Sequence, residues 1–140
     1  MVVVDGKGLP LGGALFSASP AEVTLAEPTL ATVAVPRPGR GRPRKNPRRV
    51  IGDKGYDSEA LRERLAARGI ELVAPHRRNR TAPPLQDGRP LRRYRKRWKI
   101  ERTFAWLGNF RRLVVRWDRD LTIYTGFFHV ACALIALRYL

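Results

Sequence analysis

Glu101 is the single acid of a strongly basic segment. Arg89–Leu113 holds ten Lys or Arg residues, and no other acid occurs between Asp87 and Asp118. Cationic groups at this density can neutralise phosphates, and a lone carboxylate among them is a candidate functional group. The alternative is that Glu101 only pairs with Arg97, four residues earlier on the same helix, in an ion pair worth roughly 0.3–0.5 kcal/mol.

A second acid, Asp53, lies where a strand is predicted to end. Arg49–Ser58 is expected to begin as a short buried strand that ends in Asp53 and then turns into a helix, and Ile70–Ala74 is expected to form the next strand. Two strands joined through a helix pair in parallel with a right-handed crossover. Functional side chains gather beyond the carboxyl ends of such strands, which is where Asp53 lies.

Local signals delimit the helix between these two strands. Asp57 or Ser58 can cap its start, and Gly69 can end it. The spacing places Leu61 and Leu65 inward and the charged residues outward: Arg62, Glu63, Arg64 and Arg68. His76 follows the second strand with no other His nearby, so we expect no metal role for it.

The helix that carries Glu101 is expected to span Arg89–Leu113, with a bend near Gly108-Asn109. One set of residues falls on or near one of its faces: Leu91, Tyr94, Trp98, Glu101 and Ala105. An adjoining apolar stripe is suited to core packing: Ile100, Phe104 and Leu107. Either Asp of the following Asp118-Arg119-Asp120 can cap a last, largely buried helix over Leu121–Tyr139.

The chain is expected to begin with a hairpin. Met1–Val4 reads as a strand, Asp5-Gly6 as its turn and Leu9–Ser17 as the partner strand, so Asp5 is interpreted as a turn residue. Pro20–Val35 is expected to be helical, with Ser19 as its N-cap and Pro20 at its first position. Pro28 should kink or split this helix.

The segment Pro36–Arg49 changes composition abruptly, with seven basic residues, four Pro and two Gly among 14 positions. It is therefore predicted to be a basic loop rather than a packed element. Within it, Gly39-Arg40-Gly41-Arg42-Pro43 resembles the AT-hook, an extended arm whose arginines enter the narrow minor groove of A·T-rich DNA. A solvated basic loop without that role is the alternative for Arg40 and Arg42.

Composition favours a folded protein that binds a polyanion, and nucleic acid in particular. The 140 residues carry 28 basic and 12 acidic side chains, a formal charge of +16, with 44% hydrophobic content. A single cysteine, Cys132, excludes a disulfide framework and favours a reducing compartment. No signal peptide is visible, and the apolar run Tyr124–Leu137 is too short to span a bilayer, so we expect no membrane partner.

Two motifs taken together resemble a known family. Asp53 lies in DKGYDS, and 48 positions later Glu101 lies in YRKRWKIERTFAWL, where Tyr94, Arg97 and Glu101 reproduce a Y-x2-R-x3-E signature. This pattern resembles the DDE transposases of bacterial insertion sequences. The resemblance implies an α/β fold of the ribonuclease-H-like type, a mixed sheet flanked by helices. It also implies that Asp53 and Glu101 are the second and last catalytic acids.

The implied activity is cleavage and joining of DNA strands at the ends of a mobile element, in the bacterial cytoplasm at the nucleoid. Such chemistry uses two Mg2+ ions roughly 3.5–4 Å apart, for which Asp53 and Glu101 would be ligands. Expected DNA contacts, besides those of the basic loop, come from Lys54, Tyr94, Arg97, Trp98, Arg111 and Arg112. Tyr94 or Trp98 could stack on an unpaired base, although packing in the core is favoured for both. DNA is the expected partner, and an active enzyme is expected to be a homo-oligomer.

The sequence departs from the family pattern at two places. The family often has a Lys seven residues after the Glu, where this chain has Gly108, so Arg111 or Arg112 would replace that contact. The first catalytic Asp lies on a strand that would precede Met1. Residues 1–140 are therefore expected to form the carboxyl-terminal part of the catalytic domain, without its first, central strand, poorly stable and inactive alone. An upstream-frame segment would supply the rest, and a non-catalytic DNA-binding remnant is the alternative; a ribosomal-type RNA binder rests on charge alone.

Overall fold

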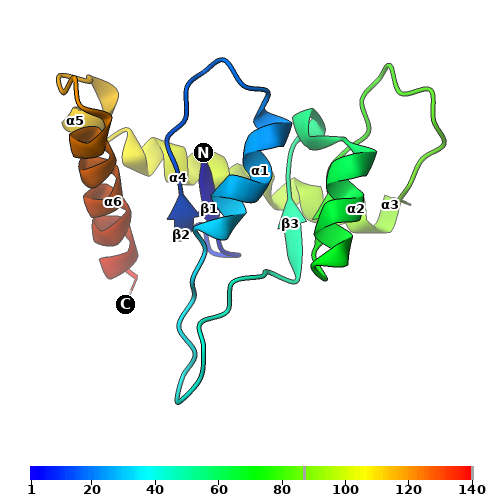
Figure 1. Cartoon of the computed structure of the whole chain (residues 1–140), viewed down its shortest axis with the longest axis horizontal. Helices are drawn as coiled ribbons and strands as arrows, with labels where there is room; N and C mark the ends of the chain where they lie inside the picture. The colour runs from blue at the N-terminus through cyan, green and yellow to red at the C-terminus, as the bar shows by residue number, and fades with distance from the viewer. Residues whose placement is uncertain (87, 140) are drawn as a thin grey trace.

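In the computed structural model, which describes residues 1–86 and 88–139, the chain forms a mixed α/β structure with two small sheets (Figure 1). The elements follow one another as β1 (Val2–Val4), β2 (Pro10–Gly13), α1 (Glu22–Ala31), β3 (Arg49–Ile51), the 3-10 turn η1 (Lys54–Tyr56), α2 (Glu59–Ala67), β4 (Glu71–Val73), α3 (Gly88–Leu91), the 3-10 segment η2 (Arg92–Arg97), α4 (Trp98–Leu107), α5 (Arg111–Val114) and α6 (Leu121–Leu137). Within these residues no helix is long and apolar enough to cross a membrane.

The chain begins with the predicted hairpin. β1 and β2 pair in antiparallel register, with Val2 opposite Gly13. Asp5 closes the turn, because its Oδ1 accepts hydrogen bonds from the backbone N–H groups of Lys7 (2.7 Å) and Leu9 (2.8 Å). The interpretation of Asp5 as a turn residue is confirmed.

The strand–helix–strand unit also forms as predicted, except that β3 is not the buried strand that was expected: Arg49 and Val50 are partly buried and Ile51 is exposed. β3 and β4 pair in parallel, with Arg49 opposite Glu71, and α2 lies between them in the chain. Of the two candidate caps, Ser58 is the N-cap and accepts a hydrogen bond from the N–H of Leu61. Leu61 and Leu65 are fully buried, and Gly69, with φ of +72°, follows the helix in the left-handed conformation that favours glycine.

Arg62 does not point outward, as the helical spacing predicted. Its side chain is only 12% exposed, and its guanidinium donates to the carbonyl oxygens of Leu72 (2.8 Å) and Ala74 (2.9 Å). These carbonyls lie at the end of β4 and just beyond it, where a buried acceptor needs a donor. The apolar stem of an arginine can cross packed surface to reach such a position.

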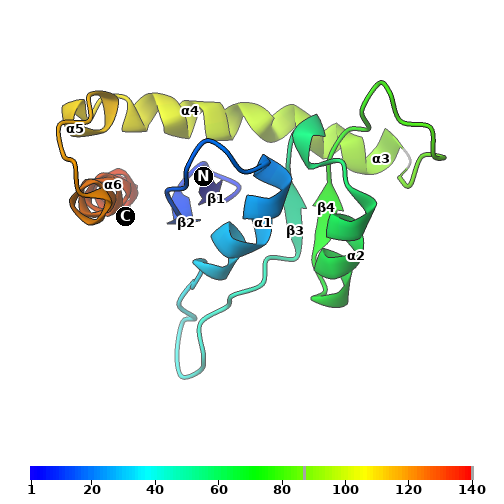
Figure 2. The same ribbon diagram turned by 45° about the horizontal axis from the view of Figure 1, so that its top comes forward.

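The long basic segment is helical but not uniformly α-helical. Figure 2 shows α3, η2, α4 and α5 following one another along one side of the molecule, with the predicted break at Gly108-Asn109. Residues 92–97 adopt the tighter 3-10 form. This form is found in short pieces next to α-helices, as here before α4.

The burial predicted for α4 and α6 is wrong as well. On α4, Phe104 is 52% exposed, and the buried line runs through Thr103 and Leu107 instead. The last helix is not largely buried, since only Phe128, Ala131 and Ile135 are core residues and its opposite face is exposed. Hydrophobicity alone did not identify which face of either helix has a neighbour.

Helix α1 is shorter than predicted and is not split. It begins after Ala21 rather than after Ser19, and Ser19 instead takes part in a hydrogen bond with the Ser17 hydroxyl. Pro28 lies inside the helix, where it removes one backbone donor. Burial of Ala26, Thr29 and Leu30 on the same helix offsets that loss.

The core consists of two apolar clusters on either side of β1. One joins α1, α2 and β4 (Ala26, Leu30, Leu61, Leu65, Ile70, Leu72, Ala74), and the other joins α4 and α6 (Leu107, Phe128, Ala131, Ile135). Val3 packs against the first cluster and Val2 against the second. Successive side chains of a strand point to opposite faces, so β1 is covered on both.

Candidate active site

Asp53 follows the end of β3, which stops at Ile51 rather than at Asp53 itself, and the Asp53 side chain is exposed. It caps η1, and its Oδ1 accepts a hydrogen bond of 2.7 Å from the N–H of Gly55. The negative charge reaches Tyr56: burial, followed by the charges of Glu22 and Asp53, raises the pKa of this phenol to about 12. Asp53 therefore sits in an acidic turn with one oxygen fixed by backbone.

Glu101 lies in the first turn of α4 and is exposed. It forms the intrahelical ion pair with Arg97 that the sequence offered as the simpler role. β3 contacts η2, the segment that leads into α4. Figure 2 shows the long helical run passing close to the end of β3. The two candidate acids thus come from neighbouring elements.

A divalent cation would find suitable donor chemistry here but an incomplete set of ligands. Exposed carboxylate oxygens are what Mg2+ prefers. Within residues 1–86 and 88–139, however, no three His, Cys, Asp or Glu side chains are grouped so that they could hold a metal ion. The residues present therefore have the right chemistry for metal ligands, but the described residues do not supply a complete set of ligands.

The turn of the N-terminal hairpin sets the orientation of α4. Three side chains of this helix donate to three successive carbonyl oxygens: Lys99 to Gly6, Arg102 to Lys7, and Thr103 to Gly8. Thr103 is fully buried and its bond measures 2.6 Å. Glu101 lies outside the face of α4 that is hydrogen-bonded to the turn, and it stays exposed.

Trp98 is half exposed, so core packing, which the sequence favoured for it, is wrong. Its ring lies 4.8 Å from the guanidinium carbon of Arg102, which also lies 4.6 Å from the ring of Trp106. Tyr94 is partly buried, with the Arg97 guanidinium 5.5 Å from its ring. An aromatic surface bounded by cations is therefore present one turn before Glu101.

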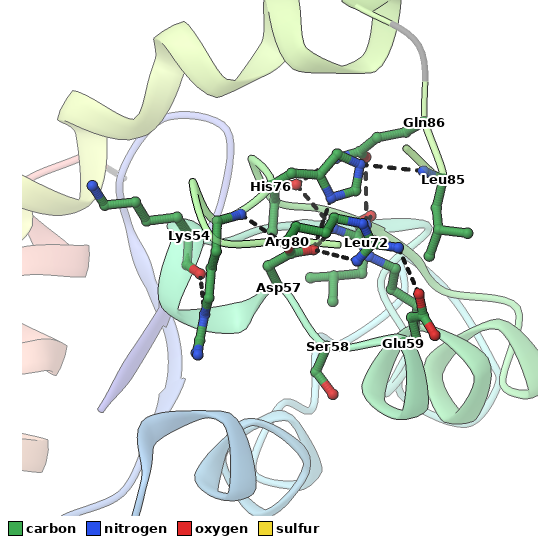
Figure 3. A network of polar contacts seen from close by, with 12 residues as sticks. Lys54, Asp57, Ser58, Glu59, Leu72, His76, Arg80, Leu85 and Gln86 are labelled. Atoms are coloured by element: carbon green, nitrogen blue, oxygen red, sulfur yellow. Dashed lines mark hydrogen bonds and ion pairs between the residues drawn. The ribbon is translucent and has the colours of Figure 1, made fainter. Parts of the chain in front are cut away.

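The other predicted DNA contacts are spread over the surface. Lys54 is exposed, and Figure 3 shows its amino group pointing away from the neighbouring polar network. Arg111 and Arg112 lie on α5, beyond the end of α4. Arg40 and Arg42 are exposed on the long loop that extends from the body of the molecule in Figure 1. This loop is drawn together at its base by an antiparallel bridge between Val35 and Arg44.

Sequence reasoning missed the role of Asp57, which it considered only as a helix cap. The side chain of Asp57 is 2% exposed and is surrounded by donors (Figure 3). Its Oδ1 lies 3.0 Å from both Arg62 Nη2 and His76 Nδ1, and its Oδ2 accepts from the N–H of Arg77 at 2.9 Å. Arg80 Nη1 is 3.7 Å away.

This network fixes the protonation pattern of His76. Nε2 accepts a hydrogen bond of 3.2 Å from the N–H of Leu85, so the proton is on Nδ1 and points to Asp57. Burial alone would raise the pKa of Asp57, but the hydrogen bonds from Arg77, Arg62 and His76 outweigh it and lower the pKa. Asp57 therefore ties α2 to the loop after β4. The concentration of basic residues after that strand was the available signal.

Comparison with known proteins shows which family the chain matches. Residues 1–136 match the family described as Transposase DDE domain. The chain is 40% identical over 134 residues to a protein of Burkholderia cepacia named as a transposase for insertion sequence element IS402, and 37% identical over 91 residues to one of Brucella ovis named for element IS6501. The alignments cover 96% and 64% of this chain and 60% and 67% of the two relatives. No solved structure matches at a significant level.

Proposed function

Since the chain belongs to the transposase DDE domain family, we propose that it contributes Asp53 and Glu101 to metal-dependent cleavage and joining of DNA strands at insertion-sequence ends. The observation that carries this proposal is the placement of the two acids. Asp53 lies beyond a parallel-paired strand, and Glu101 lies on the helix that follows η2, which contacts that strand. Both acids are exposed and are mounted on regular elements.

Asp53 and Glu101 would hold the divalent metal ions that the family implies. When bound, such ions supply the positive charge that activates a hydroxyl nucleophile and stabilises the leaving oxygen of a phosphodiester. Glu101 pairs with Arg97 through Oε1, and a cation that bound this oxygen would displace the guanidinium. The freed guanidinium would then be available to bind a DNA phosphate beside the site.

The surrounding residues would bind the DNA itself. Trp98, exposed and flanked by Arg102, would stack on an unpaired base with Tyr94 beside it. Lys54, Arg111 and Arg112 would neutralise phosphates, a contribution that falls steeply with salt. Arg40 and Arg42 would reach the minor groove from the long loop. Preference for A·T-rich over G·C-rich duplexes in a gel shift tests that role, and equal binding contradicts it.

The finer fold that we propose is ribonuclease-H-like, with its central strand supplied by polypeptide encoded upstream of this chain. Support comes from the sheets: β1 pairs only with β2, and β3 only with β4, among the described residues. A strand inserted between them would join the two pairs into one sheet and bring a third carboxylate toward Asp53 and Glu101. Without it the chain would be poorly stable and inactive alone.

The active form is proposed to be a homo-oligomer that assembles through α6. An apolar line on this helix recurs at the alternating four- and three-residue spacing of helix-pairing surfaces: Ile123, Phe127, Val130, Leu134 and Leu137. Four of the five are between 44% and 62% exposed. The proposed partner is DNA, and the proposed place of action is the bacterial cytoplasm, at the nucleoid.

A non-catalytic DNA-binding remnant is the second candidate. It is favoured by the Arg97–Glu101 ion pair and by the absence of a three-ligand metal group in residues 1–86 and 88–139. In this alternative the basic surface binds DNA, and neither acid takes part.

One experiment separates the two. Cleavage of element-end DNA is measured with the chain joined to its upstream-encoded segment, with Mg2+ and after EDTA treatment. We expect activity that requires the metal and is lost in Asp53→Asn and in Glu101→Gln, and is retained in the control Glu63→Gln, an exposed acid on α2. Salt-sensitive binding that neither change affects, with no cleavage, would establish the remnant instead.

A further inference from the structure

Among the residues that the structure describes, Trp117 is the most exposed large hydrophobic side chain, at 67%. It lies in the loop between α5 and α6. Together with Arg111 and Arg112 it lines a surface hollow of about 440 Å3. This volume is within the range of sites that hold small organic groups. The hollow thus combines a solvent-exposed indole with two guanidinium groups. The indole can stack on a flat ring of a ligand, and the guanidinium groups can bind an anionic group attached to that ring.

Hydrogen bonds and a cation–π contact hold the loop that carries Trp117. The guanidinium of Arg116 donates to the carbonyl oxygens of Asp118 (2.9 Å) and Arg119 (3.0 Å) and lies 5.5 Å from the ring of Tyr124. The hydroxyl of Tyr124 in turn donates to the carbonyl of Leu113 at 2.8 Å. The Arg116 bonds hold the loop to itself, and Tyr124 connects it to α6, while the indole of Trp117 stays exposed.

The charge of the hollow is positive on balance. Arg112 is 3.8 Å from Asp118 and 5.2 Å from the ring of Phe127, so its ion pair is loose. For Arg111 the part of the chain that the structure describes shows no ion pair and no hydrogen bond from its guanidinium. The whole protein carries +16. An apolar protein segment would have to desolvate these guanidinium groups without compensation, whereas a nucleic acid strand pairs with them.

We propose that Arg111, Arg112 and Trp117 form a second contact for single-stranded DNA, separate from Trp98. In it, Trp117 stacks on an unpaired base and the two arginines bind the flanking phosphates. The proposal rests on the proposed function for its ligand, and it adds Trp117 and a path for the strand. Arg111 and Arg112 lie on α5, beyond the break at Gly108-Asn109 that separates it from the helix of Trp98.

The test is the affinity of the purified chain for a fluorescein-labelled 12-nucleotide oligothymidine, measured by fluorescence anisotropy at several salt concentrations. Trp117→Leu should weaken binding by about 5- to 100-fold, the range for loss of one base–aromatic stack. Trp117→Phe should restore most of it. Arg111→Gln with Arg112→Gln should make the slope of log K against log salt shallower by about 1.4, or about 0.7 for each phosphate released.

An abasic 12-mer supplies the decisive comparison. It keeps the phosphates and lacks the bases, so Trp117→Leu should bind it as the unmodified protein does. Phe16→Leu, which shortens another exposed aromatic far along the chain, is the matched control and should bind both strands normally.

Three results would overturn the proposal. These are equal binding of the intact 12-mer by Trp117→Leu, an equal loss on the abasic strand, or a change in molecular mass rather than in DNA affinity. Each leaves the proposed function intact as long as the unmodified protein binds DNA. If the unmodified protein binds neither strand nor element-end duplex, both proposals fail.

Discussion

Replacing Gly8 by alanine should loosen α4 from the hairpin that orients it. Gly8 is buried and has φ of +86°, a conformation that costs a residue with a Cβ about 1–2 kcal/mol. The added Cβ would lie 3.1 Å from Arg102 Nη2, 3.2 Å from the backbone oxygen of Lys99 and 3.4 Å from Thr103 Oγ1. The middle contact is with helix backbone, so α4 itself must shift. Weakening the Thr103 hydrogen bond adds about 1 kcal/mol. We expect a total loss of about 2–3 kcal/mol.

The measurement is urea unfolding followed by circular dichroism at 222 nm. Gly6→Ala is the matched control in the same turn, because Gly6 has no positive φ and a Cβ there would meet nothing within 4 Å. It should change the free energy of unfolding by less than about 0.5 kcal/mol. Thr103→Val provides an independent probe, since it keeps the side-chain shape but leaves the Gly8 carbonyl without its donor, at about 1–3 kcal/mol.

If the three donors of α4 act through this turn, the effects of Gly8→Ala and Thr103→Val must overlap. The double variant should then lose less stability than the sum of the two single changes. Gly8→Ala as stable as Gly6→Ala would refute the orienting role. So would strict additivity of the two changes, because the turn and the helix would then be independent.

Two further predictions concern the polar network and α6. Asp57→Asn should destabilise the fold by about 3–5 kcal/mol, because it removes the carboxylate that balances the charge of the buried Arg62. The folded state lowers the pKa of Asp57, so its contribution is present above the ordinary carboxyl pKa and is lost as pH falls through the lower folded value. Urea midpoints from pH 7 downward should therefore fall less steeply in Asp57→Asn, and an unchanged pH profile would contradict this. Val130→Lys should abolish self-association in sedimentation velocity, whereas Thr122→Lys, exposed near the start of α6, should not; equal behaviour of the two would argue against pairing through α6.

The elements that the sequence predicted correctly depend on local chemistry. The Asp5 turn, the Ser58 cap and the stop at Gly69 each need only a few neighbouring residues, and all three form. Parallel pairing of β3 and β4 followed from two apolar runs joined by a helix. The position of Asp53 near the end of a strand could therefore be predicted, since it depends only on where that strand ends.

What the sequence did not predict depends on partners distant in the chain. Arg62 turned inward because carbonyls at the end of β4 and the carboxylate of Asp57 needed donors. Phe104 stayed exposed because the Asp5–Gly8 turn is hydrogen-bonded to the side of α4 that carries Thr103. For the candidate site, the placement of each acid in the chain's elements was predictable: Asp53 after a strand and Glu101 on the basic helix. The ion pair of Glu101 with Arg97 was one of two readings that the sequence left open.

Two surfaces of the fold call for different kinds of partner. β1 is packed on both faces, through Val2 and Val3, yet within the described residues it pairs along one edge only. Backbone groups on the free edge of a strand covered on both faces are best satisfied by another strand. Helix α6 satisfies its backbone bonds internally, so its exposed line requires only apolar surface, which a second copy of the same helix can provide. A segment that completes the sheet should therefore raise the stability of the fold without removing self-association. Val130→Lys should remove self-association without raising stability.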